Sequence, residues 1–241
     1  MTDQTVSPSS WAHSRNPAGR RHLLEDHHRV TARLAREFAN DFGAGDLAYY
    51  AALWHDVGKF INPAFQDYLF RCEQDPLAGG HGPDHKSAGA QLALKSTPSL
   101  ALLVQGHHGG LKTPNHLRAW MAQRASDPAP DDAMARAQRA LPDLQPDGQL
   151  ELPKRVKDDE ISSEMFLRMV FSCLVDADYL DTEGHFSHGR TEMRGSNLTL
   201  GDLWERFERN QAAFVSDTRG TVNRIRREAG EVDRPAQRFD Y

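Results

Sequence analysis

Apolar residues recur along most of this chain at the three- to four-residue spacing that gives a helix one buried face. The pattern predicts five longer helices, over about residues 23–40, 46–54, 100–107, 158–181 and 200–228. Shorter helices are expected after Asn62 and after Asp84, on either side of a glycine-rich loop. No segment alternates apolar and polar residues as a half-buried strand does. The sequence therefore predicts an all-α fold.

The same pattern predicts one domain with two loose ends. Residues 1–10 offer no apolar anchor and are expected to be disordered, residues 11–229 to form a single domain, and residues 230–241 to be a flexible tail. Within the domain, residues 126–152 are rich in Pro, Ala and charged side chains, which is typical of a surface insertion. We expect this insertion to carry no chemistry.

Composition narrows the class of protein and points to one unusual feature. No apolar run approaches the about 20 residues that a membrane span needs, and the N-terminus lacks the apolar core of a secretory signal, so a cytoplasmic protein with no membrane partner is expected. A net charge of −5 neither indicates nor excludes a nucleic-acid partner. Twelve histidines in 241 residues are the one compositional excess that needs a reason.

Several histidines stand where predicted helices bury their apolar faces. The apolar run 52–54 ends in His55 and Asp56, and His107 continues the stripe of the helix that begins near Leu100. Buried His and Asp side chains are costly to desolvate unless something binds them, and a divalent metal is the usual partner. Seven residues from at least five predicted elements make up the candidate ligand set: His27, His55, Asp56, His85, His107, His108 and Asp176.

The residue types in this set indicate which ions it would hold. Neutral imidazoles with few carboxylates favour Mn, Fe, Co or Ni over Mg or Ca, which prefer oxygen ligands alone. Mg stays possible. A carboxylate beside a histidine is suited to bridge two ions about 3.5–4 Å apart, as in two-metal hydrolytic sites. We therefore expect two divalent transition-metal ions.

Simpler interpretations compete for individual residues. A single histidine on an apolar helix face is usually a core residue, which applies to His27 and His85 taken alone but not to seven candidates together. Asp178 and Asp181 compete with Asp176, but they are expected on other helix faces, where capping or solvation explains them. Five further histidines are expected to be exposed polar residues: His22, His81, His116, His185 and His188.

The role of the positive charges is also open at this point. Lys59 is either part of a catalytic site or a solvated residue beyond a helix end, where the helix dipole favours it. Six other basic residues either guide a nucleic-acid strand or belong to a scattered solvated surface: Arg15, Arg20, Arg21, Lys86, Lys112 and Arg118.

The ordered set of candidate ligands resembles the HD phosphohydrolase superfamily. Local strings are similar to the HD nuclease domain of the type I CRISPR effector nuclease-helicase, over about residues 11–229. The strings that carry this resemblance are 24–27, 55–59, 65–69, 82–90, 106–111 and 174–183. No helicase follows them, so the resemblance implies a stand-alone nuclease subunit or an excised domain.

The resemblance implies an HD-domain helical bundle with a dinuclear metal site. One ion would be held by His27, His55, Asp56 and Asp176, and the other by Asp56, His85, His107 and His108, so that Asp56 bridges them. Asp56 and Lys59 would be the catalytic residues, with Lys59 near the scissile phosphate. His13 matches an Ala-His-Ser string of that family and is expected to support the site. The family carries a hydrophobic residue where this chain has His28, and the register of the stripe favours His27 as the ligand.

The activity that the resemblance implies is metal-dependent cleavage of single-stranded DNA in CRISPR interference, an antiviral defence. The expected partners are single-stranded DNA, a CRISPR helicase subunit or domain and a surveillance complex; endonuclease and exonuclease action both stay open. One alternative is a nucleotide or cyclic-nucleotide phosphohydrolase of the same superfamily, and another is an inactive, metal-stabilised recruitment module. The complete ligand set disfavours the recruitment module, and the strings around His85, His107 and Asp176 favour the nuclease.

Overall fold

The computed structural model describes residues 9–61, 63–75, 82–124, 131–187, 189–190, 194, 198–216 and 224–225. Contacts group the chain into two compact units, Met1–Glu192 and Met193–Tyr241. The predicted single domain over residues 11–229 includes parts of both units. Of the two ends that were predicted to be loose, residues 1–8 and 230–241 lie outside the described residues.

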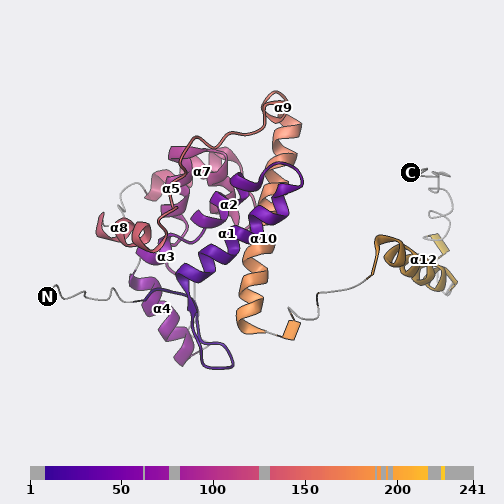
Figure 1. The fold of residues 1–241 in the computed structure, drawn as a ribbon, viewed down its shortest axis with the longest axis horizontal. Helices are drawn as coiled ribbons and strands as arrows, with labels where there is room; N and C mark the ends of the chain where they lie inside the picture. The colour runs from indigo at the N-terminus through magenta and orange to yellow at the C-terminus, as the bar shows by residue number, and fades with distance from the viewer. Residues whose placement is uncertain are drawn as a thin grey trace. The chain divides into compact units, whose positions relative to one another are not determined.

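The first unit is a bundle of helices preceded by a short antiparallel hairpin (Figure 1). The hairpin pairs β1 (Trp11–His13) with β2 (His22–Leu23). The helices are α1 (Leu24–Asn40), α2 (Gly45–Trp54), α3 (Gly58–Ile61), α4 (Pro63–Gln74), α5 (Ser87–Ser96), α6 (Leu100–Gly106), α7 (Pro114–Arg124), α8 (Asp131–Ala140), α9 (Lys154–Lys157) and α10 (Glu160–Phe186). The all-α prediction is confirmed, with the hairpin as a small addition that period-two patterning could not reveal in strands this short.

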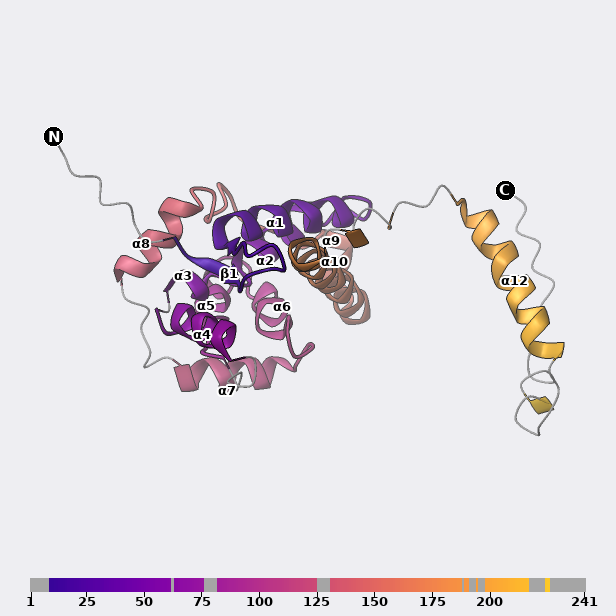
Figure 2. The ribbon, with the colours of Figure 1, turned by 90° about the horizontal axis from the view of Figure 1, so that it is seen from below.

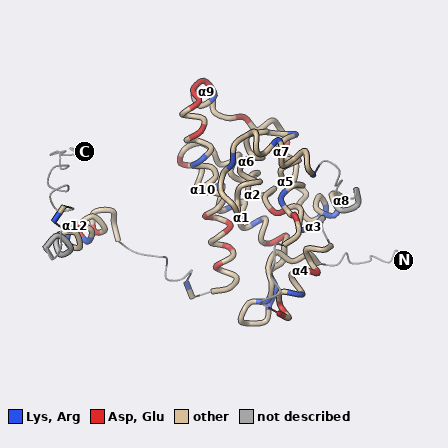
Figure 3. The backbone as a smooth tube through the Cα atoms, turned by 180° about the vertical axis from the view of Figure 1, so that it is seen from behind, with Lys and Arg blue, Asp and Glu red and all other residues tan. Residues whose placement is uncertain are grey.

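Helix α2 is the centre of the bundle because it is apolar on every side. Its Ala48, Ala51, Leu53 and Trp54 are fully buried, which is the pattern of a core helix rather than a surface one. Helices α1 and α10 pack against it and against each other (Figure 2). Acidic residues recur along α10 in Figure 3, and those in its C-terminal half include side chains that turn toward α1.

Two glycines allow the chain to approach itself closely beside α2. A Cβ atom on Gly89 would lie 1.8 Å from the carbonyl oxygen of Trp54, so α5 meets the end of α2 backbone to backbone. A Cβ atom on Gly58 would lie 2.1 Å from the carbonyl oxygen of His85, which accepts a hydrogen bond from the Gly58 N–H at 3.0 Å. These approaches hold the turn after α2 against the segment that carries His85.

The segment predicted to be a surface insertion is part of the core. Within its described part, Ala137, Leu141 and Leu144 are fully buried. The Trp54 indole N–H donates to the carbonyl oxygen of Leu144 at 2.9 Å, and the Thr97 hydroxyl donates to that of Leu150 at 2.8 Å. The prediction was wrong because a Pro- and Ala-rich composition is also compatible with a chain that packs across a helix. Residues 125–130 lie outside the described part.

The second unit contains α12 (Leu200–Ser216), where a helix was predicted over about residues 200–228. Leu203, Trp204 and Phe207 form an exposed apolar stripe along it. None of the described helices combines the length and the apolar character needed to cross a bilayer.

We predict that Leu144→Ala destabilises the protein, since Leu144 is fully buried and the substitution leaves a cavity in the core. The expected loss is about 2–5 kcal/mol in the free energy of unfolding, measured by chemical denaturation. Gln149→Ala is the matched control, because Gln149 lies in the same segment and is exposed. Equal, small effects of the two substitutions would show that the segment is a surface insertion after all.

Candidate metal centre

Asp56 lies in the turn after α2, and its carboxylate is the point on which the surrounding side chains converge. It is 1% exposed. Its Oδ2 atom faces His55 Nε2 at 3.3 Å and His27 Nε2 at 3.7 Å. Its Oδ1 atom faces His107 Nε2 at 3.5 Å and His85 Nε2 at 3.7 Å. Each oxygen therefore faces a different pair of histidines, as a bridging carboxylate requires.

The far side of each ring is hydrogen-bonded in a way that turns Nε2 toward Asp56. The Nδ1 atoms lie close to carbonyl oxygens of Ala52, Pro83 and Val104, at 2.6 Å for His55, 3.0 Å for His85 and 2.7 Å for His107. A carbonyl oxygen only accepts, so each Nδ1 carries the hydrogen and each neutral ring keeps its Nε2 lone pair for the centre. This arrangement is the usual one for histidines that ligate metals.

The unsatisfied atoms of the centre fit a bound cation. Asp56 Oδ1, His85 Nε2 and His107 Nε2 are buried and have no hydrogen-bond partner, a costly arrangement because lone pairs face lone pairs. One group of ligand atoms, from Asp56, His85, His107 and His108, lies within 4.8 Å of one another, and so does a second group from His27, His55 and Asp178. With Asp56 beside both groups, the residues present suit two divalent ions.

Asp178 takes the place that the sequence analysis gave to Asp176. Asp178 Oδ1 lies 3.4 Å from His27 Nε2 and 3.7 Å from His55 Nε2, whereas Asp176 is exposed. Two residues along a helix turn it by about 200°, so the two carboxylates point in nearly opposite directions. The signal that was missed is the spacing of Asp178 four residues after the buried Leu174.

Charge and burial set the protonation of the metal-free centre. Burial raises the pKa of Asp56, but the charges of Lys59 and His55 outweigh it and hold that pKa well below its usual range. Burial likewise lowers the pKa of His55, but the Asp56 charge and hydrogen bonds to Asp178 and Asp56 raise it to about 10. Burial lowers the pKa of His108 to about 3, so that ring is neutral. The carboxylates around His55 thus favour a positive charge at this position, which a bound cation would also supply.

Lys59 belongs to the centre and is not a solvated residue. Its side chain is 5% exposed, and its Nζ atom lies 2.5 Å from Asp56 Oδ2. The same ammonium donates to the carbonyl oxygen of Ala12 in β1 at 3.2 Å and lies 5.0 Å from the ring centroid of Phe65. Contacts from the hairpin, from the turn that holds Asp56 and from α4 thus fix the Lys59 ammonium beside the Asp56 carboxylate.

The histidines outside the predicted ligand set fall into different environments. His13, predicted to support the site, contacts His27 edge-on, with ring centroids 4.9 Å apart. His22 and His185 were predicted to be exposed, but they are half-buried and stack on each other with centroids 4.7 Å apart. His116 is exposed as predicted. His81 and His188 lie outside the described residues.

Two of the six basic residues considered as a strand-guiding patch, Arg15 and Arg21, form ion pairs within the protein. Arg21 forms a two-pronged ion pair with Glu73, at 2.9 and 2.6 Å, and Arg15 lies 3.7 Å from the same carboxylate. These two therefore brace the hairpin against α4.

His28 is not a ligand in either group, although it is fully buried beside the centre. Its ring stacks on Phe60 with centroids 5.4 Å apart, and neither ring nitrogen has a hydrogen-bond partner. His27 is therefore the residue of this pair that faces the centre, as the register predicted.

We predict that His28→Leu stabilises the protein. It replaces two buried, unsatisfied nitrogens with an apolar side chain of similar size, and the free energy of unfolding should rise by about 1–3 kcal/mol. The measurement is denaturant unfolding of the metal-free protein. His116→Leu is the exposed control and should change stability by less than about 0.5 kcal/mol. A loss of stability in His28→Leu would mean that the ring is satisfied in solution.

We predict that Asp178→Asn removes a metal ion and that Asp176→Asn does not. The first substitution takes a charged ligand from the group with His27 and His55, and the second changes an exposed carboxylate on the same helix. Elemental analysis after dialysis should find one ion fewer per chain in Asp178→Asn. Chelation should then lower its melting temperature less than that of the unsubstituted protein, because fewer ions stabilise the folded state. The reverse result would restore Asp176 to the site.

Comparison with known proteins agrees with this geometry. The HD domain family matches residues 24–144, half of the chain, from the start of α1 to the buried Leu144. The matched segment includes His27, the His55-Asp56 pair and the histidines that face Asp56 Oδ1. No curated protein matched the chain. HD domains bind divalent metals and are metal-dependent phosphohydrolases in general, in keeping with the two groups of ligands around Asp56. The chain belongs to the HD domain family.

Proposed function

We propose that this protein is a nuclease that cleaves single-stranded DNA in CRISPR interference. In this proposal a helicase subunit or domain at a surveillance complex supplies the strand. The support is twofold: the resemblance of the strings around His85, His107 and Asp176, and a pocket beside Lys59 whose walls suit unpaired bases.

The residues of the centre have distinct tasks in such a reaction. His27, His55 and Asp178 would hold one ion, and His85, His107 and His108 the other, with Asp56 between them. The chemistry supplied by bound ions is the activation of water and the polarisation of a phosphate oxygen. Lys59 is held by Ala12 and Asp56, and it adds a fixed positive charge for an incoming phosphate.

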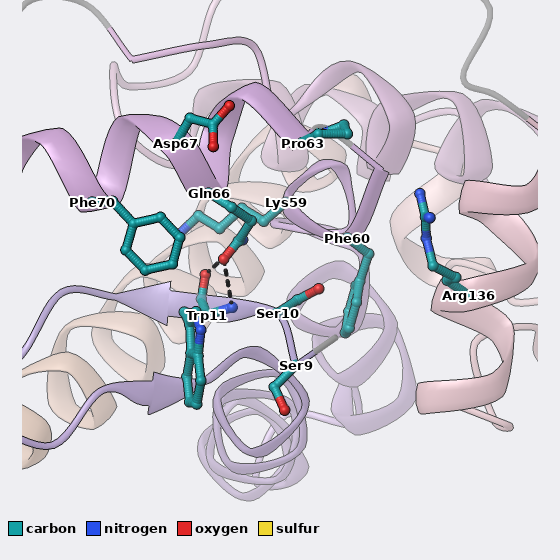
Figure 4. A pocket seen from close by; sticks show the side chains of 10 residues that line it. All are labelled: Ser9, Ser10, Trp11, Lys59, Phe60, Pro63, Gln66, Asp67, Phe70 and Arg136. Atoms are coloured by element: carbon teal, nitrogen blue, oxygen red, sulfur yellow. Dashed lines mark hydrogen bonds between the residues drawn. The ribbon is translucent and has the colours of Figure 1, made fainter. Parts of the chain in front are cut away.

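The pocket adjoins the centre through Lys59. Its volume is about 470 Å³, and Figure 4 shows its walls, which come from the start of the hairpin, α3, α4 and α8. The lining residues are Ser9, Ser10, Trp11, Lys59, Phe60, Pro63, Gln66, Asp67, Phe70 and Arg136. Because Lys59 contacts Asp56 and also lines this space, a chain bound in the pocket would be separated from the proposed hydrolytic centre by the Lys59 side chain.

The walls of the pocket favour unpaired bases. Trp11 and Phe70, which line this space and are half-buried, offer flat aromatic surfaces, on which bases of any sequence stack. Gln66 fixes the hairpin to α4, since its side chain accepts from the Trp11 N–H at 3.0 Å and donates to the Trp11 carbonyl oxygen at 3.2 Å (Figure 4). Bases in a duplex are already stacked and paired, so single strands should bind better.

A nucleotide phosphohydrolase is the second candidate, and the same pocket supports it. One nucleotide could lay its base on Trp11 and its phosphate beside Lys59 without any longer strand. The two candidates differ in the substrate that they require, so a covalently closed single-stranded circle separates them: only a nuclease that cuts internally acts on it.

We predict cleavage of a single-stranded circle in the presence of Mn²⁺, Co²⁺ or Ni²⁺, and loss of cleavage in His55→Ala. Phe70→Ala should lower kcat/KM about 5- to 150-fold, the equivalent of about 1–3 kcal/mol for one stacked base. Phe38→Ala is the matched control, because Phe38 is a partly exposed aromatic of α1 that does not line the pocket. Turnover of free nucleotides without cleavage of the circle, across these metals, would favour the phosphohydrolase.

A further inference from the structure

A second cluster of histidines lies on the far side of the His27 ring from Asp56. His13 on β1 and His22 on β2 are register partners in the hairpin, and their Nδ1 atoms lie 3.2 Å apart. One nitrogen of His27 lies within 4.8 Å of a nitrogen of each. Three imidazoles from β1, β2 and α1 thus converge at a point that the dinuclear centre does not use.

The spacing of the two hairpin nitrogens suits a shared ion. In a tetrahedral zinc site with Zn–N bonds of 2.0–2.1 Å, two nitrogen ligands lie about 3.3 Å apart. The observed 3.2 Å is close to that separation. A single N–H···N hydrogen bond accounts for the same distance without an ion, so the surroundings of the two rings decide between these possibilities.

The far nitrogen of each hairpin histidine has an oxygen partner of its own. His22 Nε2 lies 3.4 Å from Asp181 Oδ2, and His13 Nε2 lies 3.4 Å from the hydroxyl oxygen of Thr182. When both Nε2 atoms carry hydrogens donated to these oxygens, both Nδ1 lone pairs point to the same place. Metal-ligating histidines almost always have such an outer acceptor, whereas a hydrogen bond between the two rings needs the Thr182 hydroxyl to donate to His13 Nε2 instead.

We propose that His13, His22 and His27 form a third metal site, which shares the His27 ring with the dinuclear centre and takes Zn²⁺ or a similar ion with a preference for imidazole. His27 Nε2 faces Asp56, whereas its Nδ1 atom lies 2.6 Å from Asp181 Oδ2. The ion binds His27 through Nδ1 and displaces the proton there to solvent, so that one ring joins the two sites. Asp181 then offers a negative charge beside the ion.

The consequence of this site is control of the hairpin. Ala12, next to His13, provides the carbonyl oxygen that holds Lys59, and Trp11 lines the pocket. An ion on His13 and His22 would cross-link the two strands of the hairpin and tie them to α1. The site goes beyond the proposed nuclease activity and does not depend on it, because its occupancy is measured without any substrate.

The test is the number of ions bound by the full chain. After chelation and reloading with Co²⁺, the unsubstituted protein should bind three ions per chain and show the intense visible absorption of tetrahedral Co²⁺. The double variant His13→Gln/His22→Gln should bind two ions and lose that absorption. His116→Gln, a change at an exposed histidine, should bind three. Circular dichroism reports whether each variant folds.

A variant of the other centre keeps the test decisive if the double variant does not fold. Asp56→Asn removes the carboxylate shared by the dinuclear ions but leaves the hairpin histidines in place, so it should retain the tetrahedral Co²⁺ absorption. Two ions in the unsubstituted protein at saturating Co²⁺, or no tetrahedral absorption in Asp56→Asn, would overturn the third site. Loss of all ions in a folded double variant would also overturn it and make these histidines supports of the dinuclear centre.

Discussion

A buried carboxylate surrounded by imidazoles is the constraint on which the rest of this structure depends. Asp56 is almost fully buried, with the Lys59 ammonium and the His55 ring beside one of its oxygens. Its neighbours come from α1, the turn after α2, the segment before α5, the segment after α6, and α10. The bundle must therefore bring the ends of several helices to one point, because a charge that lost its partners in this interior would cost several kcal/mol.

Two features of the scaffold bring these helix ends together. One is the central helix α2, most of which is buried, and the other is a pair of backbone contacts at glycines that leave no room for a side chain. Gly58 and Gly89 bring the segment around His85 and the start of α5 against the end of α2, backbone to backbone. A larger residue at either position would separate the two halves of the centre. The segment that follows α8 covers α2 from another side, where the Trp54 indole is bonded to Leu144. The core and the site are thus built by the same contacts.

The sequence predicts the parts of this structure that repeat at helical spacing. Helices α1, α2 and α6 follow from stripes of apolar residues, as do the histidines within α1 and directly after α2 and α6. His27 is distinguished from His28 by its place on the stripe of α1. Asp178 was missed because Asp176, Asp178 and Asp181 all lie near the end of one helix, and only the packing of α10 decides which face is inward. The packing of residues 131–152 and the pairing of β1 with β2 depend on contacts distant in sequence, which composition does not encode.

The hairpin gives the centre a connection that an isolated bundle would lack. Through Ala12 it fixes the Lys59 ammonium, through Trp11 it forms a wall of the adjoining pocket, and through His13 it touches the ring of His27. A displacement of this short element would therefore change the charge beside Asp56, the shape of the pocket and the packing of a metal ligand together. Arg21 and Gln66 also tie the hairpin to α4. A nucleic-acid strand that entered the pocket would therefore meet walls that are fixed to each other. Under the proposed function, the position of the substrate and the position of the hydrolytic groups are set by the same three residues of β1.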